Sequence, residues 1–149
     1  MTCTSLMTAP ADHLDSRDTV AQAVDKMLRT GQTVLAVTEA DGRLKGTFGL
    51  KQAVRLILPV AARLDVDLGD LAYFGEGLAD LTRRYGEAAQ ATVGEHTAEC
   101  DTVHETAAAM EALLLLSRGD GLLPVVDDRR RLVGVITAAH ALSVISGAC

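Results

Sequence analysis

The sequence predicts an α/β fold, more closely an α+β sandwich, in which two β-α-β-β-α repeats are related by a pseudo-twofold axis. Two internal matches predict it. Residues 18–27 (DTVAQAVDKM) match residues 101–110 (DTVHETAAAM) at an offset of 83. Residues 34–48 match residues 122–136 at an offset of 88, which implies five extra residues after Met110. Self-similarity of this kind indicates one structural unit that is used twice.

Each repeat is expected to open with a short extended piece followed by a capped helix. Thr19 and Gln22 have the spacing of a capping box, and Thr102 and Glu105 have the same spacing, so a helix should begin just after each Thr. The apolar positions then share one helical face in each repeat. They are Val20, Val24, Met27 and Leu28 in the first repeat and Val103, Ala107, Met110 and Leu114 in the second.

A hairpin and a second helix complete each repeat. The outgoing strands read TVLAV and LLPVV, and the return strands read RLKGTF and RLVGVI. Asp41-Gly42 predicts a tight hairpin turn, because Gly accepts a positive φ. The closing helices carry their apolar residues at Leu50, Val54, Ile57 and Leu58 in the first repeat, and at Ala138, Ala141, Leu142 and Ile145 in the second.

The domain organisation follows from these elements. The first repeat with its N-terminal tail covers residues 1–58, a helical connector covers 59–89, and the second repeat covers 90–149. In the connector, Pro59 should end the preceding helix, residues 65–70 read as a loop and residues 71–86 as a helix. A unit of about 50 residues has an uncovered sheet face and exposed strand edges. The two repeats should therefore pair and form two equivalent clefts between them.

Composition excludes several classes of protein. The chain has 149 residues and a net charge of −6, so a nucleic-acid-binding role, which needs a basic surface, is not expected. No apolar run approaches the length of a membrane span, and the N-terminus lacks the pattern of a signal peptide. Three cysteines suit free thiols in a cytoplasmic protein. His96, Cys100 and His104 have helical spacing, but they are not expected to share a helix, so no metal site is expected.

The repeated pattern resembles a tandem of cystathionine β-synthase (CBS) domains, the Bateman module. The resemblance rests on D-T-V…M, on an apolar strand ending P-V-V-D and on L-V-G-V-I-T, and it covers roughly residues 6–58 and 90–146. The second repeat is the closer match, since Ala36 replaces the proline found at Pro124. The resemblance implies a regulatory module without catalysis, a homodimer, and an adenosine-containing ligand such as AMP, ADP, ATP or S-adenosylmethionine. No cofactor is required.

The family's ligand loop has the form G-h-x-T-x-x-D, in which the Thr meets phosphate and the Asp holds the ribose. In the second repeat Gly134 and Thr137 match, but His140 stands at the Asp position. In the first repeat only Gly46 matches, with Gly49 at the Thr position and Gln52 at the Asp position. The resemblance therefore implies a better phosphate site in the second repeat and no ribose carboxylate in either loop. Thr137 is equally expected to act as a plain helix N-cap.

Candidate ligand residues follow from the loops and the neighbouring strands. In the second repeat they are Val93, His96, Gly121, Leu122, Leu123, Pro124, Val125, Gly134, Thr137 and His140; in the first, weaker site they are Pro10, His13, Thr33, Val34, Ala36 and Gln52. Two functions from different classes stay open. The chain is either a stand-alone regulatory sensor of an adenosyl ligand or a dimerisation and partner-binding scaffold that has lost nucleotide binding. An enzyme is not expected, because no nucleophile, base and oxyanion donor are found together.

Overall fold

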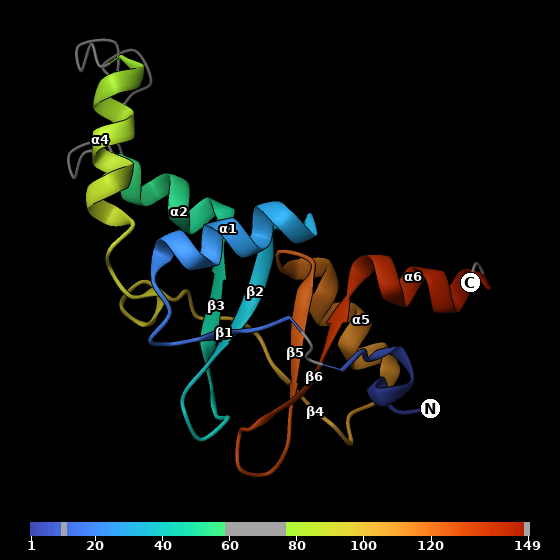
Figure 1. Cartoon of the computed structure of the whole chain (residues 1–149). Helices are drawn as coiled ribbons and strands as arrows, with labels where there is room; N and C mark the ends of the chain where they lie inside the picture. Colours follow the sequence, from blue (N-terminus) through green and yellow to red (C-terminus); the bar gives the residue numbers. More distant parts are fainter. Residues whose placement is uncertain (10–11, 59–76, 148–149) are drawn as a thin grey trace.

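The computed structural model describes residues 1–9, 12–58 and 77–147, and in it two β-α-β-β-α repeats lie side by side (Figure 1). In the first repeat the elements are β1 (Leu14–Asp15), α1 (Val20–Thr30), β2 (Val34–Thr38), β3 (Leu44–Gly49) and α2 (Leu50–Ile57). In the second repeat they are β4 (Val103–His104), α5 (Ala109–Arg118), β5 (Leu122–Val126), β6 (Leu132–Thr137) and α6 (Ala138–Ser146). The predicted fold class and element order are confirmed.

Each repeat has its own three-stranded sheet, with strand orders β1-β2-β3 and β4-β5-β6. The first two strands of each sheet run parallel, and the last two form an antiparallel hairpin. Register pairs Leu35 with Phe48 in the first sheet and Leu123 with Ile136 in the second. All four side chains are buried, so the same face of each hairpin supplies the core of its repeat.

Each repeat packs against a short 3-10 helix that comes from the segment before the other repeat. Helix η1 (Cys3–Leu6) packs in the core of the second repeat, whereas η3 (Val93–Glu95) packs in the core of the first. The N–H of Thr8 donates to the carbonyl oxygen of Val135 at 2.9 Å, and the N–H of Ala98 donates to that of Thr47 at 2.8 Å. Each repeat is therefore completed by the segment that precedes the other, which joins the two repeats into one unit.

The hairpin turns also join the repeats. The N–H of Leu44 donates to the carbonyl oxygen of Arg130 at 2.9 Å, and the N–H of Leu132 donates to that of Gly42 at 3.0 Å. Gly42 has the positive φ (86°) that the Asp41-Gly42 turn predicts, and Arg130 adopts a φ of 61° at the matching turn. Between the hairpins, Ala36, Leu44 and Val126 form a small buried cluster of their own.

Helix α4 (Leu78–Ala88) is the described part of the connector, and it stands out from the body beyond α2 (Figure 1). It has no buried residue. It overlaps the helix predicted over 71–86 but ends two residues later; Pro59 and the loop predicted over 65–70 lie outside the described residues. No helix among the described residues has the length and apolarity that a membrane span requires.

The helix start predicted in the first repeat is confirmed, whereas the one predicted in the second is wrong. Thr19 caps α1, and its Oγ1 accepts from the N–H of Gln22 at 3.2 Å in a complete capping box. Thr102 instead precedes strand β4, and α5 begins at Ala109. The two D-T-V strings are thus not structurally equivalent: Leu14 pairs with Val37 just as Val103 pairs with Val125. The structure therefore does not contain the five-residue insertion that was inferred from the offset between these strings.

The predicted apolar helix faces also need correction. In α5 the buried residues are Ala109 and Ala112, whereas Met110 is 75% exposed and Leu114 is 53% exposed. In α1 Val20 and Met27 are buried as predicted, but Leu28 points outward. The apolar residues predicted for the closing helices are largely external too, since Val54, Leu142 and Ile145 are exposed. These side chains form an apolar outer surface rather than core.

Candidate functional site

The strand-to-helix junction of the second repeat is built around Thr137. Strand β6 ends at Thr137, whose Oγ1 accepts from the N–H of His140 at 3.1 Å. The N–H of Ala138 donates to the carbonyl oxygen of Gly121 at 3.1 Å, which ties the start of α6 to the loop before β5. Gly121 has a φ of 88°, so this loop needs glycine there. Thr137 is therefore the helix N-cap, and its hydroxyl proton is left to donate elsewhere.

The matching junction of the first repeat caps its helix differently. Gln52 reaches back, and its Oε1 accepts from the N–H of Gly49 at 2.8 Å. The N–H of Leu50 donates to the carbonyl oxygen of Thr33 at 2.9 Å, as Ala138 does to Gly121. A Cβ at Gly49 would lie 2.7 Å from that same Thr33 oxygen. The first loop thus has no hydroxyl at the position of Gly49, and the Gln52 oxygen already has a partner.

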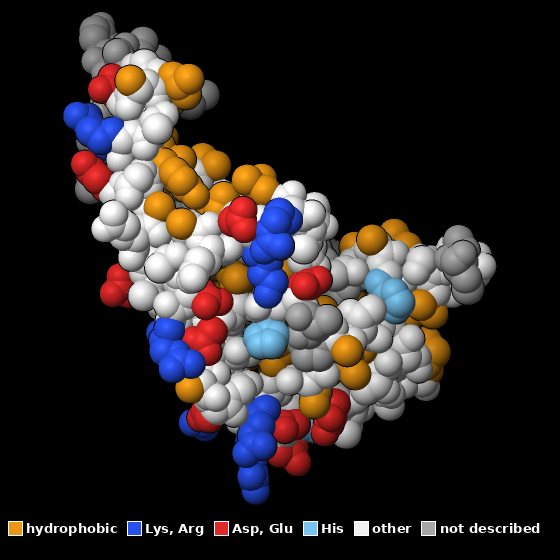
Figure 2. Space-filling model, in the orientation of Figure 1, with side chains coloured by type: hydrophobic (Ala, Val, Ile, Leu, Met, Phe, Trp, Pro, Cys, Tyr) orange, Lys and Arg blue, Asp and Glu red, His pale blue; other side chains and the backbone are white. Residues whose placement is uncertain are grey.

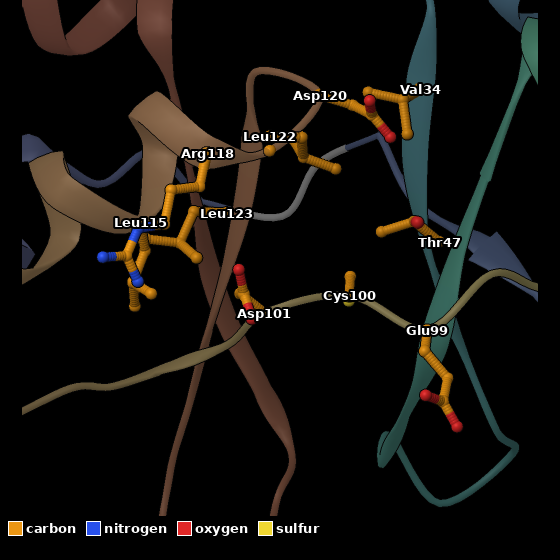
Figure 3. A pocket seen from close by; sticks show the side chains of 11 residues that line it. Val34, Thr47, Glu99, Cys100, Asp101, Leu115, Arg118, Asp120, Leu122 and Leu123 are labelled. Atoms are coloured by element: carbon orange, nitrogen blue, oxygen red, sulfur yellow. The ribbon is translucent and has the colours of Figure 1, made fainter.

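A cavity of about 360 Å³ lies between the repeats (Figure 3). Its walls come from three stretches of chain that are distant in sequence. They are Val34 and Thr47 of the first repeat, Glu99, Cys100 and Asp101 of the segment before β4, and Leu115, Arg118, Gly119, Asp120, Leu122 and Leu123 of the second repeat. Cavities that bind small molecules in proteins usually measure about 300 to 1,000 Å³. This cavity is therefore large enough for a small ligand.

Two smaller cavities lie along the first-repeat junction. One of about 230 Å³ is lined by Thr33, Val34, Gly49, Leu50, Lys51, Gln52 and Asp120. It shares Val34 and Asp120 with the larger cavity, so the two meet at those residues. The other, of about 260 Å³, is lined by Gln52, Arg55, Leu56, His96, Thr97 and Ala98. The start of α2 is thus flanked by open space on both sides.

The structure brings together three of the residues predicted for the first site. Thr33, Val34 and Gln52 line one cavity. Ala36 is 1% exposed and belongs to the buried cluster between the hairpins. His13 is exposed, and its carbonyl oxygen accepts from Nζ of Lys26 at 2.9 Å. Pro10 lies outside the described residues.

The residues predicted for the second site are distributed more widely. Leu122 and Leu123 line the large cavity, and Gly121, Thr137 and His140 meet at the second junction. His96 lies beside Gln52, so it belongs with the first junction rather than the second, because the segments before β1 and β4 are exchanged.

The remaining residues predicted for the second site are enclosed by protein. Pro124 and Val125 are fully buried, and Val93 is buried in the core of the first repeat. Gly134 is covered by Met7 and Thr8, which a Cβ at that position would meet. None of these four residues lines the three cavities described above.

Sequence reasoning missed several residues that line the large cavity, among them Thr47, Cys100 and Asp120. No motif marks them, because each comes from a different segment. Burial raises the pKa of the Cys100 thiol, so this cysteine lines the cavity as a neutral thiol and not as a reactive thiolate. Asp120 follows Gly119 and precedes Gly121 at the end of α5, a glycine-flanked turn that could have suggested an exposed site residue.

Comparisons with known proteins agree with the fold. A search of curated proteins finds no match. Among solved structures, the CBS-pair protein CBSX2 of Arabidopsis thaliana superposes with a TM-score of 0.74 at 17% identity, covering 98% of this chain and 94% of that one. CBSX2 in complex with AMP superposes with a TM-score of 0.69 at 20% identity, covering 98% and 96%.

A longer protein gives a similar match. The protein MJ1004 of Methanocaldococcus jannaschii superposes with a TM-score of 0.70 at 13% identity, and this chain, covered to 99%, spans 60% of its length. The family model for the CBS domain matches residues 3–59 and 93–147, which together make up most of the chain. The chain therefore belongs to the CBS domain family, and its two matched regions form a tandem CBS pair.

Proposed function

We propose that this CBS pair is a regulatory module that binds an adenine nucleotide in the cavity between its repeats. The observation that carries the proposal is the composition of that cavity. Val34, Leu115 and Leu122 form the apolar part of its lining, which suits a flat base, and the polar part comes from Thr47, Glu99, Asp101, Arg118 and Asp120. Lys51, on the first turn of α2, lines the adjoining cavity, where a cation and the start of a helix both favour a phosphate.

One solved structure of the same fold contains an adenine nucleotide. CBSX2 was crystallised with AMP, and it shares the fold of this chain over nearly the whole length of both proteins. At 20% identity this likeness shows the fold alone. The ligand is inferred for this chain from its own cavity.

The proposed role is regulation rather than catalysis. One hydrogen-bonded chain of a hydroxyl, an imidazole and a carboxylate does occur: Thr106 Oγ1 lies 2.8 Å from Nδ1 of His104, whose Nε2 lies 2.7 Å from Oδ1 of Asp128. Neither Thr106 nor His104 lines the cavity between the repeats. The N–H of Thr106 also donates to Nδ1 of His104, so these contacts hold the turn after β4 against the β5–β6 hairpin. Their role is structural.

A homodimer is the second part of the proposal. Large apolar side chains stay exposed on the outer faces of the helices, and orange patches gather there in Figure 2. They are Leu28 of α1, Val54 of α2, Met110 and Leu114 of α5, and Leu142, Val144 and Ile145 of α6. Apolar patches of this extent favour a protein–protein contact. A second copy of the chain, related by a twofold axis, would cover the same face on both subunits.

Sedimentation tests the dimer. Leu142→Asp with Ile145→Asp should convert the dimer to a monomer, because both positions are exposed and the fold does not depend on them. Leu78→Asp is the matched control, since Leu78 is 80% exposed on α4. A monomeric wild type, or a double variant that is still dimeric, would overturn this part of the proposal.

The free thiols of Cys3 and Cys100 suit a reducing compartment such as the cytoplasm.

Calorimetry and thermal shift test the ligand. Protein refolded free of bound nucleotide should show a higher Tm with AMP, ADP or ATP, since a ligand that binds the folded state stabilises it by mass action. Val34→Trp fills the cavity wall and should abolish the shift, whereas Ala40→Trp, on the exposed β2–β3 turn, should not. Absence of any shift at millimolar nucleotide would refute nucleotide binding. It would favour the alternative of a partner-binding scaffold. Two features of the first loop agree with that alternative: the Gln52 amide oxygen is already hydrogen-bonded, and Gly49 provides no hydroxyl at the Thr position.

A further inference from the structure

We infer that Asp120, from the second repeat, supplies the ribose-binding carboxylate that the ligand loop of the first repeat lacks. The inference rests on the proposed nucleotide function and assigns a residue to it. Asp120 follows α5 and lines both the 360 Å³ cavity and the 230 Å³ cavity. Figure 3 shows its carboxylate beside Val34, the other residue common to both.

The order of the cavities matches the order of groups in an adenine nucleotide. In the larger cavity Leu115, Leu122 and Val34 form the apolar part of the lining, which suits the base. The smaller cavity opens on Lys51 and the start of α2, which suit the phosphate. The ribose joins base to phosphate, so it would occupy the place where the cavities meet. Asp120 is the acidic residue at that place.

The chemistry of Asp120 fits the ribose. The two oxygens of a carboxylate can accept hydrogen bonds from two neighbouring hydroxyl groups, and such charge-assisted bonds are stronger than bonds to a neutral amide. Among the described residues no hydrogen bond or ion pair engages the Asp120 side chain, which is exposed at the cavity. Gln52, by contrast, has its amide oxygen bound to the N–H of Gly49.

The two clefts differ in this carboxylate. Because Val34 and Leu122 begin equivalent strands, the residue equivalent to Asp120 in the first repeat is Gln32. The second repeat therefore provides a carboxylate to the cleft of the first repeat, whereas the first repeat, with Gln32 at the equivalent position, provides none to the second. The cleft at the first junction should be the one that recognises the ribose, although its own loop has departed further from the family pattern.

The test compares two ligands on matched variants. Binding of AMP and of 2′,3′-dideoxy-AMP, which lacks both ribose hydroxyls, is measured by calorimetry on wild type, Asp120→Asn and Glu111→Gln. Wild type should prefer AMP, and Asp120→Asn should reduce that preference about tenfold, the typical effect of weakening a charged hydrogen bond. Any change in phosphate repulsion acts on both ligands and cancels in the ratio. Glu111→Gln removes an exposed carboxylate of α5 that lines neither cavity and should leave the ratio unchanged.

The outcomes separate the two levels of the proposal. If wild type binds AMP and Asp120→Asn keeps the wild-type ratio, the assignment of Asp120 is overturned while the nucleotide function stands. If Glu111→Gln lowers the ratio as much as Asp120→Asn, the effect is one of overall charge and the assignment is again overturned. If wild type binds neither nucleotide at millimolar concentration, the function and the assignment fail together. Because Asp120 is exposed, circular dichroism should show the variant folded.

Discussion

The N–H of Cys3 donates to the carbonyl oxygen of Ala107 at 2.8 Å, so the N-terminal segment packs in the second repeat although the first repeat follows it in the sequence. Nearby, Leu6 is fully buried with Ile136 in the core of the second repeat. The same exchange buries Val93 with Phe48 in the first. Since each core needs a segment from outside its own repeat, the two repeats should unfold together.

Leu6→Ala should therefore destabilise the second repeat and, through it, the whole chain. Removing a buried Leu side chain lowers the free energy of unfolding by about 2–5 kcal/mol. Ser5→Ala is the matched control in the same 3-10 helix, because Ser5 is exposed. Urea unfolding followed by circular dichroism measures both. A change below about 0.5 kcal/mol for Leu6→Ala, the range usual for surface sites, would contradict the exchanged packing.

The capping threonines provide a direct test of the corrected helix boundary. Thr19→Ala removes the cap of α1 and should lower the free energy of unfolding by about 1 kcal/mol. Thr102→Ala changes a residue that precedes β4 and caps no helix, so its effect should be smaller. If the two variants lose equal stability in urea unfolding, α5 begins near Thr102 after all.

The sequence predicts the elements whose signals are local and strong. Thr19 with Gln22 identifies one helix start, Asp41-Gly42 identifies a turn, and Thr137 identifies the start of α6. The helix start predicted after Thr102 is wrong, because it rests on the repeated Asp-Thr-Val string. Asp-Thr-Val caps a helix in one repeat and runs into a strand in the other, because a short string takes its structure from its tertiary surroundings.

The site was less predictable than the fold. Loop residues such as Gln52 could be found because they stand at fixed positions of a motif. Asp120 and Cys100 reach the cavity from segments far apart in the sequence, and no spacing indicates that they meet. The local sequence also does not predict that His96 lies beside Gln52, since nothing in the segment before β4 indicates which repeat that segment packs against.

Gly46→Ala should destabilise the protein because the exchanged segment crosses directly over this glycine. A Cβ there would collide with the carbonyl oxygen of Ala98, a backbone atom that hydrogen bonds hold to Thr47. Overpacking of this kind lowers the free energy of unfolding by about 1–3 kcal/mol. Gly77→Ala is the control, since a Cβ there meets nothing within 4 Å and the φ of −91° is ordinary. Equal stability of the two variants in urea unfolding would argue against the close crossing.

Arg17 should stabilise the protein in a way that depends on pH. Hydrogen bonds from its side chain and its backbone N–H lower the pKa of Asp15 to about 2, and the Nε to Oδ1 distance is 2.9 Å. A carboxyl whose folded pKa lies below its unfolded value, which is about 3.9, stabilises the fold above that value and ceases to do so as pH falls toward 2. Arg17→Gln should therefore reduce the free energy of unfolding more at pH 5.5 than at pH 3, as urea titrations at the two values would show. Arg29→Gln, which breaks the exposed Arg29–Asp25 pair on α1, controls for the loss of one positive charge. A deficit for Arg17→Gln that is the same at both pH values would mean that Arg17 acts by packing and not through Asp15.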